Sequence, residues 1–430
     1  MTGGSSRVAE RVSRSPLFDA DEYLRLYPAV AAAGRDPIEH YVTDGMRGRM
    51  RGRSEQGVAR LLGRIEADFT NDARAYRRSF QDAQAEAAEP RAGGTPFVGI
   101  YCHTQAHYYM HSIAAAIDHA ILRAGGRCAL LTEVEADPSK IDVPLIVAPH
   151  EFFNMPLPDA YREPAFVDRC VMFNTEQLPS DWILEALPWL YRARAVIDLH
   201  FQSSLVWRRG GIPSTHVLPP FDAELAGRAI GEFDRRHPLV RWMDPAWLDM
   251  AGAQIRVADR PIDVFFSGHA TPARSECFAR NAAFLSRKRA VLAYARLSPV
   301  GTPRDEHTRS LFGINIALAR LAKTVLGLHR HAIGYFVWER MVVQGFGCGT
   351  PVLTGPCLRS PFFEATQHYL EAVGGHFDEM LEHLVDTADG LALGQAVADQ
   401  ARVVLERELT AARCGRFLLS FLAGLEAPDA

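Results

Sequence analysis

The feature that most constrains the fold is residues 323–354, where an apolar strand, a polar loop, a helix, a glycine turn and a second strand follow in order. The first strand is predicted over Thr324–Leu328 and the loop over His329–Gly334, and the helix carries Glu339 and Arg340. Two strands joined by such a helix are expected to be parallel, with their carboxyl ends at one edge of the sheet.

The loop of this stretch is rich in basic side chains. It places His329, Arg330 and His331 at the entrance of the helix, where free N–H groups and the helix dipole favour an anion. Ligands of parallel sheets bind outside the carboxyl ends of the strands. The sequence therefore predicts a phosphate site here.

Short apolar segments alternate with helical segments along most of the chain, which favours parallel sheets of the Rossmann type. An interdomain boundary is predicted in the Pro-, Arg- and Asp-rich residues 220–260, and another break at Pro90–Pro96. The other predicted strands are Phe97–Cys102, Cys128–Thr132, Leu145–Ala148, Cys170–Phe173, Ala195–Leu199, Ile262–Phe266, Arg289–Ala295, Pro351–Leu353 and Tyr369–Val373.

Composition fits this prediction and excludes some classes of protein. A chain of 430 residues is long enough for two domains, and a formal charge of −4 gives no general case for binding nucleic acid. The seven cysteines show no zinc or disulfide spacing, and no apolar run approaches the ~20 residues of a membrane span. With no hydrophobic signal region at the N-terminus, we expect a cytoplasmic protein. The oligomeric state stays open.

Several segments in a fixed order resemble bacterial glycosyltransferases of the two-domain GT-B class. They are Pro149-His-Glu-Phe-Phe153, Phe173-Asn-Thr-Glu-Gln-Leu178, Asp263-Val-Phe-Phe-Ser-Gly-His269 followed by Arg274, and the stretch that ends in Gly-Thr-Pro-Val352. The resemblance implies two Rossmann-like domains facing across a cleft. It also implies transfer of a sugar from a nucleotide-sugar to a saccharide, lipid-linked or protein acceptor, in bacterial surface glycoconjugate assembly.

The expected domains are a helical accessory module with a linker helix (1–95), an acceptor domain (96–255), a nucleotide-sugar domain (256–390) and terminal helices (391–430). Residues 15–53, here called the N-terminal module, resemble a short helical module found beside such enzymes. We expect residues 1–14 to be loose and residues 55–90 to form one polar helix. The arginines at 47, 49, 51 and 53 are expected to form a solvated linker, with contact to an acidic surface as the alternative.

The donor site should hold a diphosphate with fixed positive or dipolar groups. The predicted donor-binding residues are Gly268, Arg274, His329, Arg330, Glu339, Arg340 and Gly349. Many retaining GT-B enzymes carry two glutamates eight positions apart, and these positions fall on Phe336 and Gln344 here. That pair is absent, so the stereochemistry of transfer stays open.

On the acceptor side, His150, Glu151 and Glu176 follow predicted strands and are the catalytic candidates, because an inverting transfer needs a base for the incoming hydroxyl. His103, His107 and His111 suit acceptor contacts or an exposed loop better than zinc, since no Cys or Glu completes a ligand set. GT-B enzymes usually work without a divalent metal, so we expect none, and no cofactor.

Two other functions stay open for this sequence. The missing glutamate pair fits a non-catalytic scaffold that binds a nucleotide or a glycan. A nucleotide-sugar epimerase of the same architecture is the third possibility.

Overall fold

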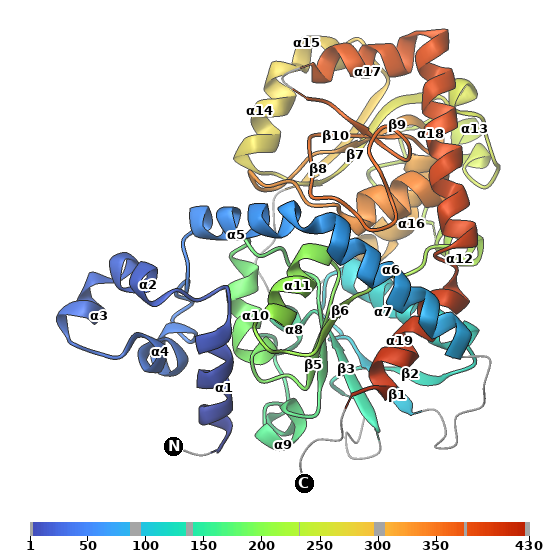
Figure 1. Cartoon of the computed structure of the whole chain (residues 1–430). Coiled ribbons are helices and arrows are strands. Elements are labelled where there is room, and N and C mark those ends of the chain that lie inside the picture. Colours follow the sequence, from blue (N-terminus) through green and yellow to red (C-terminus); the bar gives the residue numbers. More distant parts are fainter. Residues whose placement is uncertain are drawn as a thin grey trace. The chain divides into compact units, whose positions relative to one another are not determined.

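The computed structural model describes residues 3–86, 96–134, 141–231, 233–295, 306–373 and 376–425. These residues form two compact units (Figure 1). Unit 1 comprises residues 1–106, 113–219 and 412–430, and unit 2 comprises 107–112 and 220–411. Residues 220–255, predicted to belong to the acceptor domain, group with unit 2. Most of the predicted break at Pro90–Pro96 lies outside the described residues.

Unit 1 is built on a parallel sheet with the strand order β2-β1-β3-β4-β5-β6. All of its strands except the edge strand β2 are almost fully buried, as expected for a parallel sheet covered on both faces. The strands are β1 Phe97–Tyr101, β2 Arg127–Leu131, β3 Val143–Val147, β4 Val171–Asn174, β5 Ala195–Asp198 and β6 Ser214–His216. The helices that accompany them are α7 Tyr108–Arg123, α8 Pro149–Phe152, η3 Asp159–Tyr161, α9 Pro164–Val167, α10 Trp182–Leu190, α11 Phe201–Arg209 and α19 Ala411–Ala423.

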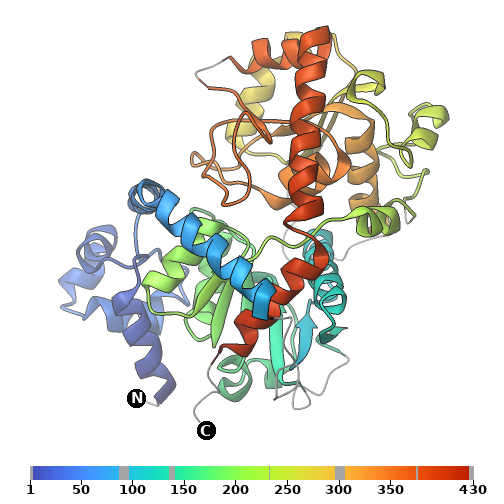
Figure 2. The same ribbon diagram turned by 45° about the vertical axis from the view of Figure 1, so that its right-hand side comes forward.

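Unit 2 has a second parallel sheet, with the order β11-β10-β9-β7-β8. Its strands are β7 Ile262–His269, β8 Ala290–Ala295, β9 Ala322–Gly327, β10 Val352–Thr354 and β11 Leu370–Glu371. The long helix α18, the upper red helix of Figure 2, packs against α17, η4 and η6. The other elements are α12 Ala223–Gly231, α13 Pro245–Met250, η4 Val257–Asp259, α14 Pro272–Arg280, α15 Ala282–Leu285, α16 Glu306–Leu321, η5 Glu339–Gly345, η6 Phe346–Cys348, α17 Phe377–Asp386 and α18 Ala388–Arg407.

The two sheets share one topology. In each, the first strand of the unit lies between the second and the third, so the strand order reverses between β1 and β3 and again between β7 and β9. Such a reversal point opens a crevice at the carboxyl ends of the strands. The predicted fold class, two Rossmann-like α/β units with an N-terminal helical extension, is confirmed.

The segment after β9 differs from the prediction in one respect. The expected α-helix is a π-helix, η5, that begins at Glu339 and passes into the 3₁₀ turn η6. Gly345 allows it to pack on β10, because a Cβ there would lie 2.2 Å from Cγ2 of Val352. The element is short and has an acid, Glu339, in its first turn, so the helix dipole contributes less to the predicted anion site than a regular α-helix would.

The N-terminal residues are ordered helices, not a loose tail. Helix α1 spans Gly3–Arg14, and Arg11, which is buried, donates hydrogen bonds to the carbonyl oxygens of Tyr191 (2.9 Å) and Ala193 (2.7 Å). The hydroxyl of Tyr191 donates to Ser15 Oγ at 2.7 Å. The start of the chain is therefore part of unit 1.

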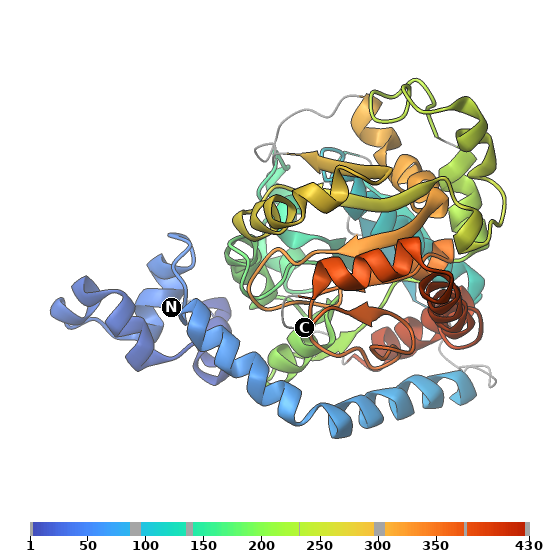
Figure 3. The ribbon, with the colours of Figure 1, turned by 90° about the horizontal axis from the view of Figure 1, so that it is seen from above.

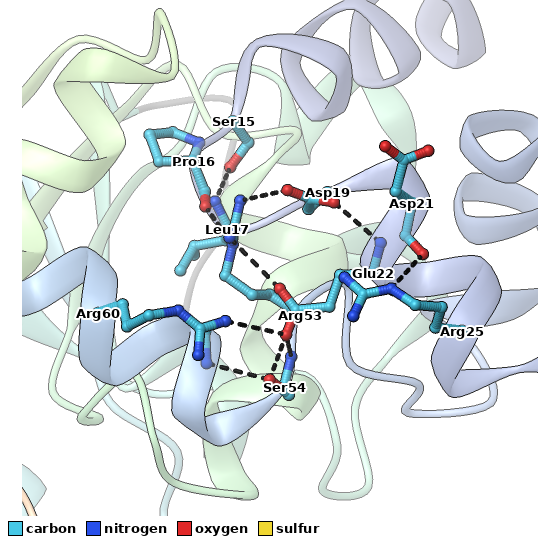
Figure 4. Close-up of polar contacts among 11 residues, drawn as sticks. Ser15, Pro16, Leu17, Asp19, Asp21, Glu22, Arg25, Arg53, Ser54 and Arg60 are labelled. Atoms are coloured by element: carbon cyan, nitrogen blue, oxygen red, sulfur yellow. Dashed lines mark hydrogen bonds and ion pairs between the residues drawn. The ribbon is translucent and has the colours of Figure 1, made fainter.

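The N-terminal module contains the predicted short helices: α2 Ala20–Leu26, α3 Pro28–Ala32, α4 Pro37–His40 and the π-turn η1 Tyr41–Gly45. A cluster of polar side chains joins the beginning of this module to its end (Figure 4). The buried carboxylate of Glu22 accepts from the hydroxyl of Ser54 and lies 3.4 Å from Arg53 Nη1. Arg53 also donates to the Pro16 carbonyl (3.0 Å) and to Asp19 (3.2 Å).

The expectation of a solvated arginine linker is wrong, because three of the four arginines make defined contacts. Arg49 pairs with Glu185 at 2.7 Å, and Arg51 pairs with Asp181 at 2.6 Å. Arg53 joins the Glu22 cluster. The alternative prediction, contact with acidic groups, describes these arginines better, and their acidic partners all belong to unit 1.

The predicted polar helix is two helices, α5 Glu55–Ala67 and α6 Phe69–Glu86, which meet at a bend (Figure 3). Their apolar face is buried through Leu61, Leu62, Ile65 and Phe80. Tyr76 donates to the carbonyl oxygen of His216 at 2.9 Å. These helices thus belong to the core of unit 1.

Candidate functional site

The carboxyl edge of the unit 2 sheet gathers most of the predicted donor-binding residues. Arg274 opens α14 after β7, His329 follows β9, and Arg340 is the second residue of η5. They meet where the strand order reverses between β7 and β9, the position at which ligands of such sheets bind.

Arg274 holds the two strand ends together. Its Nε and Nη2 donate to the carbonyl oxygen of Leu328 at 3.1 and 3.0 Å, and its Nη1 donates to that of His269 at 2.8 Å. Gly268 makes room for it, since a Cβ there would lie 3.2 Å from Arg274 Nη1 and 2.9 Å from the Phe266 ring. Arg274 is 3% exposed, and these bonds to the backbone use three of its five N–H donors.

Arg340 is different, because its charge has little compensation. Arg340 is 8% exposed, and its guanidinium donates one hydrogen bond within the described part of the chain, a long one of 3.3 Å to the Ser267 carbonyl. It forms no ion pair with a described residue. Burial lowers the pKa of Arg340, while the neighbouring Glu339 raises it. A buried cation of this kind is costly unless an anion accompanies it.

His329 sits beside this cation as a neutral side chain. Its Nε2 lies 2.9 Å from the Gly355 carbonyl and 3.2 Å from Thr354 Oγ1. Burial, reinforced by Arg340 and Arg274, lowers the pKa of His329 to about 4. Its Nδ1 is buried and has no hydrogen-bond partner among the described residues.

Glu339 belongs to a polar network that the sequence analysis did not find. The Tyr108 hydroxyl, from the short segment grouped with unit 2, donates to Glu339 Oε1 at 3.1 Å and accepts from Asn315 Nδ2 at 3.1 Å. Gln344 Nε2 donates to the same carboxylate oxygen at 3.4 Å. Burial raises the pKa of Glu339, and Arg340 opposes that shift. No sequence motif marks Tyr108 or Asn315.

Three arginine side chains lie close enough together at this edge to repel one another. Burial lowers the pKa of Arg274, and the charges of Arg340 and Arg330 lower it further, so these three cations repel one another. Glu339 is the nearby acid that acts in the opposite direction. An anion bound here would relieve this repulsion.

One predicted donor residue lies elsewhere. Gly349 is at the amino end of β10, the edge opposite to the one that carries His329. It adopts a left-handed conformation with φ 61°, which turns η6 into β10. Its backbone geometry explains the glycine without a ligand.

The carboxyl edge of the unit 1 sheet brings the three catalytic candidates together. His150 is 2% exposed, and its Nε2 lies 3.5 Å from Glu176 Oε1 and 4.0 Å from Glu151 Oε1. Glu151 and Glu176 are each 9% exposed. An imidazole between two carboxylates can hold or move a proton, which is the chemistry of a general base.

Two local features of the backbone position His150, Glu151 and Glu176. Ala148 takes a left-handed conformation with φ 54°, rare for a residue with a Cβ, and so turns β3 directly into the short helix that carries His150 and Glu151. Asn174 Nδ2 donates to the Glu176 carbonyl at 2.9 Å and to Asp198 Oδ2 at 2.8 Å, which fixes the end of β4. The strained alanine could not be recognised from sequence alone.

The predicted histidine cluster is not a single group. His103 is buried, with its Nε2 2.8 Å from the Pro156 carbonyl and 3.6 Å from Glu133, so it is not an exposed loop residue. The ring of His107 lies 5.7 Å from that of His269 in unit 2. In the part of the chain that the structure describes, no three His, Cys, Asp or Glu side chains are placed to hold a metal ion.

An Asp-x-Asp tripeptide, Asp19-Ala20-Asp21, occurs in the N-terminal module. Asp19 caps α2 by accepting from the Glu22 N–H at 2.9 Å and pairs with Arg53. Its role is therefore structural. Of the helices in the described ranges, none is long and apolar enough to cross a membrane.

No family model and no curated protein matches this sequence. Solved structures give weak likenesses. The Anabaena protein HepE in complex with UDP-glucose is 10% identical with a TM-score of 0.48, over 77% of this chain and 100% of that one. An alpha-glucosyltransferase in complex with UDP and DNA is 8% identical, with a TM-score of 0.44 over 77% and 100%. A putative UDP-N-acetylglucosamine 2-epimerase from Listeria monocytogenes is 10% identical, with a TM-score of 0.38 over 74% and 95%. At these values the likenesses establish neither a family nor an activity.

Proposed function

We propose that the chain is a glycosyltransferase whose nucleotide-sugar donor binds at the carboxyl edge of the unit 2 sheet. The observation that carries this proposal is Arg340, a buried guanidinium that forms no ion pair with a described residue. It lies beside the carboxyl end of β7, at the point where the strand order reverses and where phosphate-bearing ligands bind such sheets. A nucleoside diphosphate would supply the missing negative charge.

We assign the roles from the contacts of Arg274 and Arg340 and from the charge of Arg330 near them. Arg340 and Arg330 are the direct ligands of the diphosphate, and Arg274 keeps the strand ends in place. Glu339, with Tyr108 on its Oε1, is suited to accept hydrogen bonds from donor hydroxyls. No metal is assigned a role, so the cations of the protein stabilise the departing diphosphate.

The transfer step needs a group that takes the proton of the acceptor hydroxyl if the reaction inverts. His150, Glu151 and Glu176 form the group proposed for this role, with His150 as the base and the carboxylates stabilising its charged form. The acceptor is proposed to be a saccharide, a lipid-linked sugar or a protein in bacterial surface glycoconjugate assembly, in a cytoplasmic setting.

Donor binding is tested by isothermal titration calorimetry with UDP and GDP. The parent protein should bind at least one of them, and Arg340→Gln should weaken binding at least about tenfold, as expected for a lost charge-assisted contact. Arg280→Gln, an exposed change on the same α14 element as Arg274, is the matched control and should bind like the parent. Equal affinity of the parent and Arg340→Gln, with both folded, would refute the site.

Turnover separates the transferase from its alternatives. A panel of nucleotide-sugars is incubated with the protein, with and without a chelator, and the products are separated by chromatography. Slow release of free nucleoside diphosphate supports the transferase. An isomerised sugar nucleotide identifies an epimerase, and binding without turnover identifies a scaffold.

The base is tested in the same assay. His150→Gln and Glu176→Gln should lower turnover by about 10²–10⁴-fold while leaving UDP affinity unchanged, because they lie in unit 1. Loss of UDP binding in either variant would contradict this division of labour.

A further inference from the structure

A cavity of about 1060 Å³ opens in unit 2 at the amino edge of its sheet, opposite to the candidate donor site. Arg260 precedes β7, Arg320 ends α16 before β9, and Gly347–Gly349 precede β10. Helix α18 forms another wall through Arg402. The cavity is large enough for a metabolite-sized ligand.

The guanidinium groups of the cavity differ in how they are compensated. Arg260 is 4% exposed and donates to several backbone carbonyls, including those of Ala322 (2.9 Å) and Gly349 (2.7 Å). Arg402 pairs with Asp399 at 3.2 Å and with Glu406 at 3.8 Å. Both arginines are therefore occupied by the protein itself.

Arg320 is the uncompensated cation of this cavity. It is partly buried, donates a long hydrogen bond of 3.5 Å to the Ala251 carbonyl and also contacts the thiol of Cys348. It forms no ion pair with any carboxylate in the described ranges. Burial lowers the pKa of Arg260, and the charges of Arg320 and Arg402 lower it further, so these three guanidinium groups are near enough to repel one another.

The rest of the lining is rich in hydrogen-bond acceptors. The carboxylates of Asp222, Asp399 and Glu406 border the cavity together with the amides of Gln254 and Gln395. Carboxylates disfavour a ligand of high negative charge but accept hydrogen bonds from hydroxyl groups. The lining therefore fits one oxyanion beside Arg320 and hydroxyls on the rest of the ligand.

We propose that this cavity is a second ligand site, which binds a small hydroxylated organic oxyanion through Arg320. The oxyanion is a phosphate ester or a carboxylate, both of which match the fork of an arginine. Phe221–Ala223 and Leu409–Ala411 line the cavity where the chain passes between the two units. Occupancy should protect the amides of both segments from hydrogen exchange.

Three matched probes test the site by calorimetry: glycerol 3-phosphate, glycerate and glycerol, each in the presence of saturating UDP. At least one of the two oxyanions should bind the parent protein and glycerol should not. Stronger binding of the phosphate or of the carboxylate tells which oxyanion the site prefers. Binding of glycerol as tightly as the oxyanions, or of none of the probes at millimolar concentration, overturns the proposal.

Single substitutions test which side chain holds the oxyanion. Arg320→Gln should weaken the oxyanion at least about tenfold, and Arg320→Lys should weaken it less, because the charge stays but the fork is lost. Arg256→Gln, at a lining residue already paired with Asp259, and Arg340→Gln, in the donor site, should change affinity less than about twofold. Loss of oxyanion binding in Arg340→Gln but not in Arg320→Gln would overturn the proposal. Failure of the parent protein to bind UDP would bear only on the donor site.

Discussion

The guanidinium of Arg274 donates two hydrogen bonds to the carbonyl oxygen of Leu328, so a residue after β7 fastens the end of β9. A lysine cannot reproduce this fork. We expect Arg274→Lys to lower the free energy of unfolding by about 2–4 kcal/mol, because buried carbonyls lose charge-assisted partners. Urea unfolding measures the change, and Arg280→Lys, on the exposed part of α14, is its control. An unchanged midpoint would show that the fastening is not needed.

Arg340 should behave in the opposite way. Burial of the Arg340 charge outweighs its attraction to Glu339, and it has no ion-pair partner among the described residues, so Arg340→Gln is expected to leave the unliganded protein as stable as the parent, or about 1 kcal/mol more stable. The same variant should lose the stabilisation that UDP gives the parent in a thermal melt. A strongly destabilised Arg340→Gln would instead assign Arg340 a structural role.

His329 should make stability depend on pH. Burial lowers its folded-state pKa to about 4, below the value near 6.5 of an unfolded chain. Between these values the unfolded state binds more protons, so the contribution of His329 is complete above pH ~6.5 and is lost as the pH falls towards 4. The loss should amount to at most about 3 kcal/mol.

Urea unfolding of the parent and of His329→Asn at intervals from pH ~4 to ~7.5 checks this slope. The variant should lose less stability on acidification. Both proteins keep a further contribution of the same sign from His216 in unit 1, whose pKa burial lowers to about 3. Parallel curves for the two proteins would exclude His329 as the titrating group.

Alanine substitutions at the two glycines that flank η6 should destabilise the protein for different physical reasons. Gly345→Ala brings a Cβ within 2.2 Å of Val352 and should destabilise by about 1–3 kcal/mol through overpacking. Gly349→Ala meets no atom closer than 3.8 Å and should cost about 1–2 kcal/mol for its left-handed backbone. UDP affinity of Gly349→Ala should equal that of the parent. A loss of affinity would return Gly349 to the donor site.

Arg11 should anchor the N-terminal helix to unit 1. Arg11→Gln removes charged donors from the carbonyls of Tyr191 and Ala193 and should lower the unfolding free energy by about 2–4 kcal/mol. Arg14→Gln, whose side chain is 65% exposed in a surface pair, should change it by less than about 0.5 kcal/mol. Both should bind UDP like the parent. Equal stabilities would mean that α1 is peripheral.

Much of the fold could be predicted from the local pattern. The β9 and β10 strands, their parallel pairing and the glycine turn between them follow from a short apolar run, a connection of adequate length and the residues before Pro351. The π-helical form of η5 could not, because it depends on how Gly345 packs on Val352. The helical order of residues 3–14 was also missed, since their polar surface hides a buried Val12 and Arg11.

The candidate sites were predictable as lists of residues but not as arrangements. That His150, Glu151 and Glu176 end neighbouring strands is visible in sequence, and parallel strands bring their carboxyl ends to one edge. That Ala148 adopts a left-handed conformation, or that Tyr108 and Asn315 reach Glu339, is not visible, because partners far apart in sequence leave no local trace.

The sequence by itself determined the class of the fold and the identity of the charged residues near the strand ends, because periodicity and turn chemistry are local properties of the chain. Only the tertiary structure decided what each charge does. Arg274 and Arg340 look equivalent in sequence. In the structure, however, Arg274 donates hydrogen bonds to the carbonyl oxygens of Leu328 and His269, whereas Arg340 donates a single long one to Ser267 within the described residues. The difference arises from burial and from which acceptors the folded backbone brings within reach.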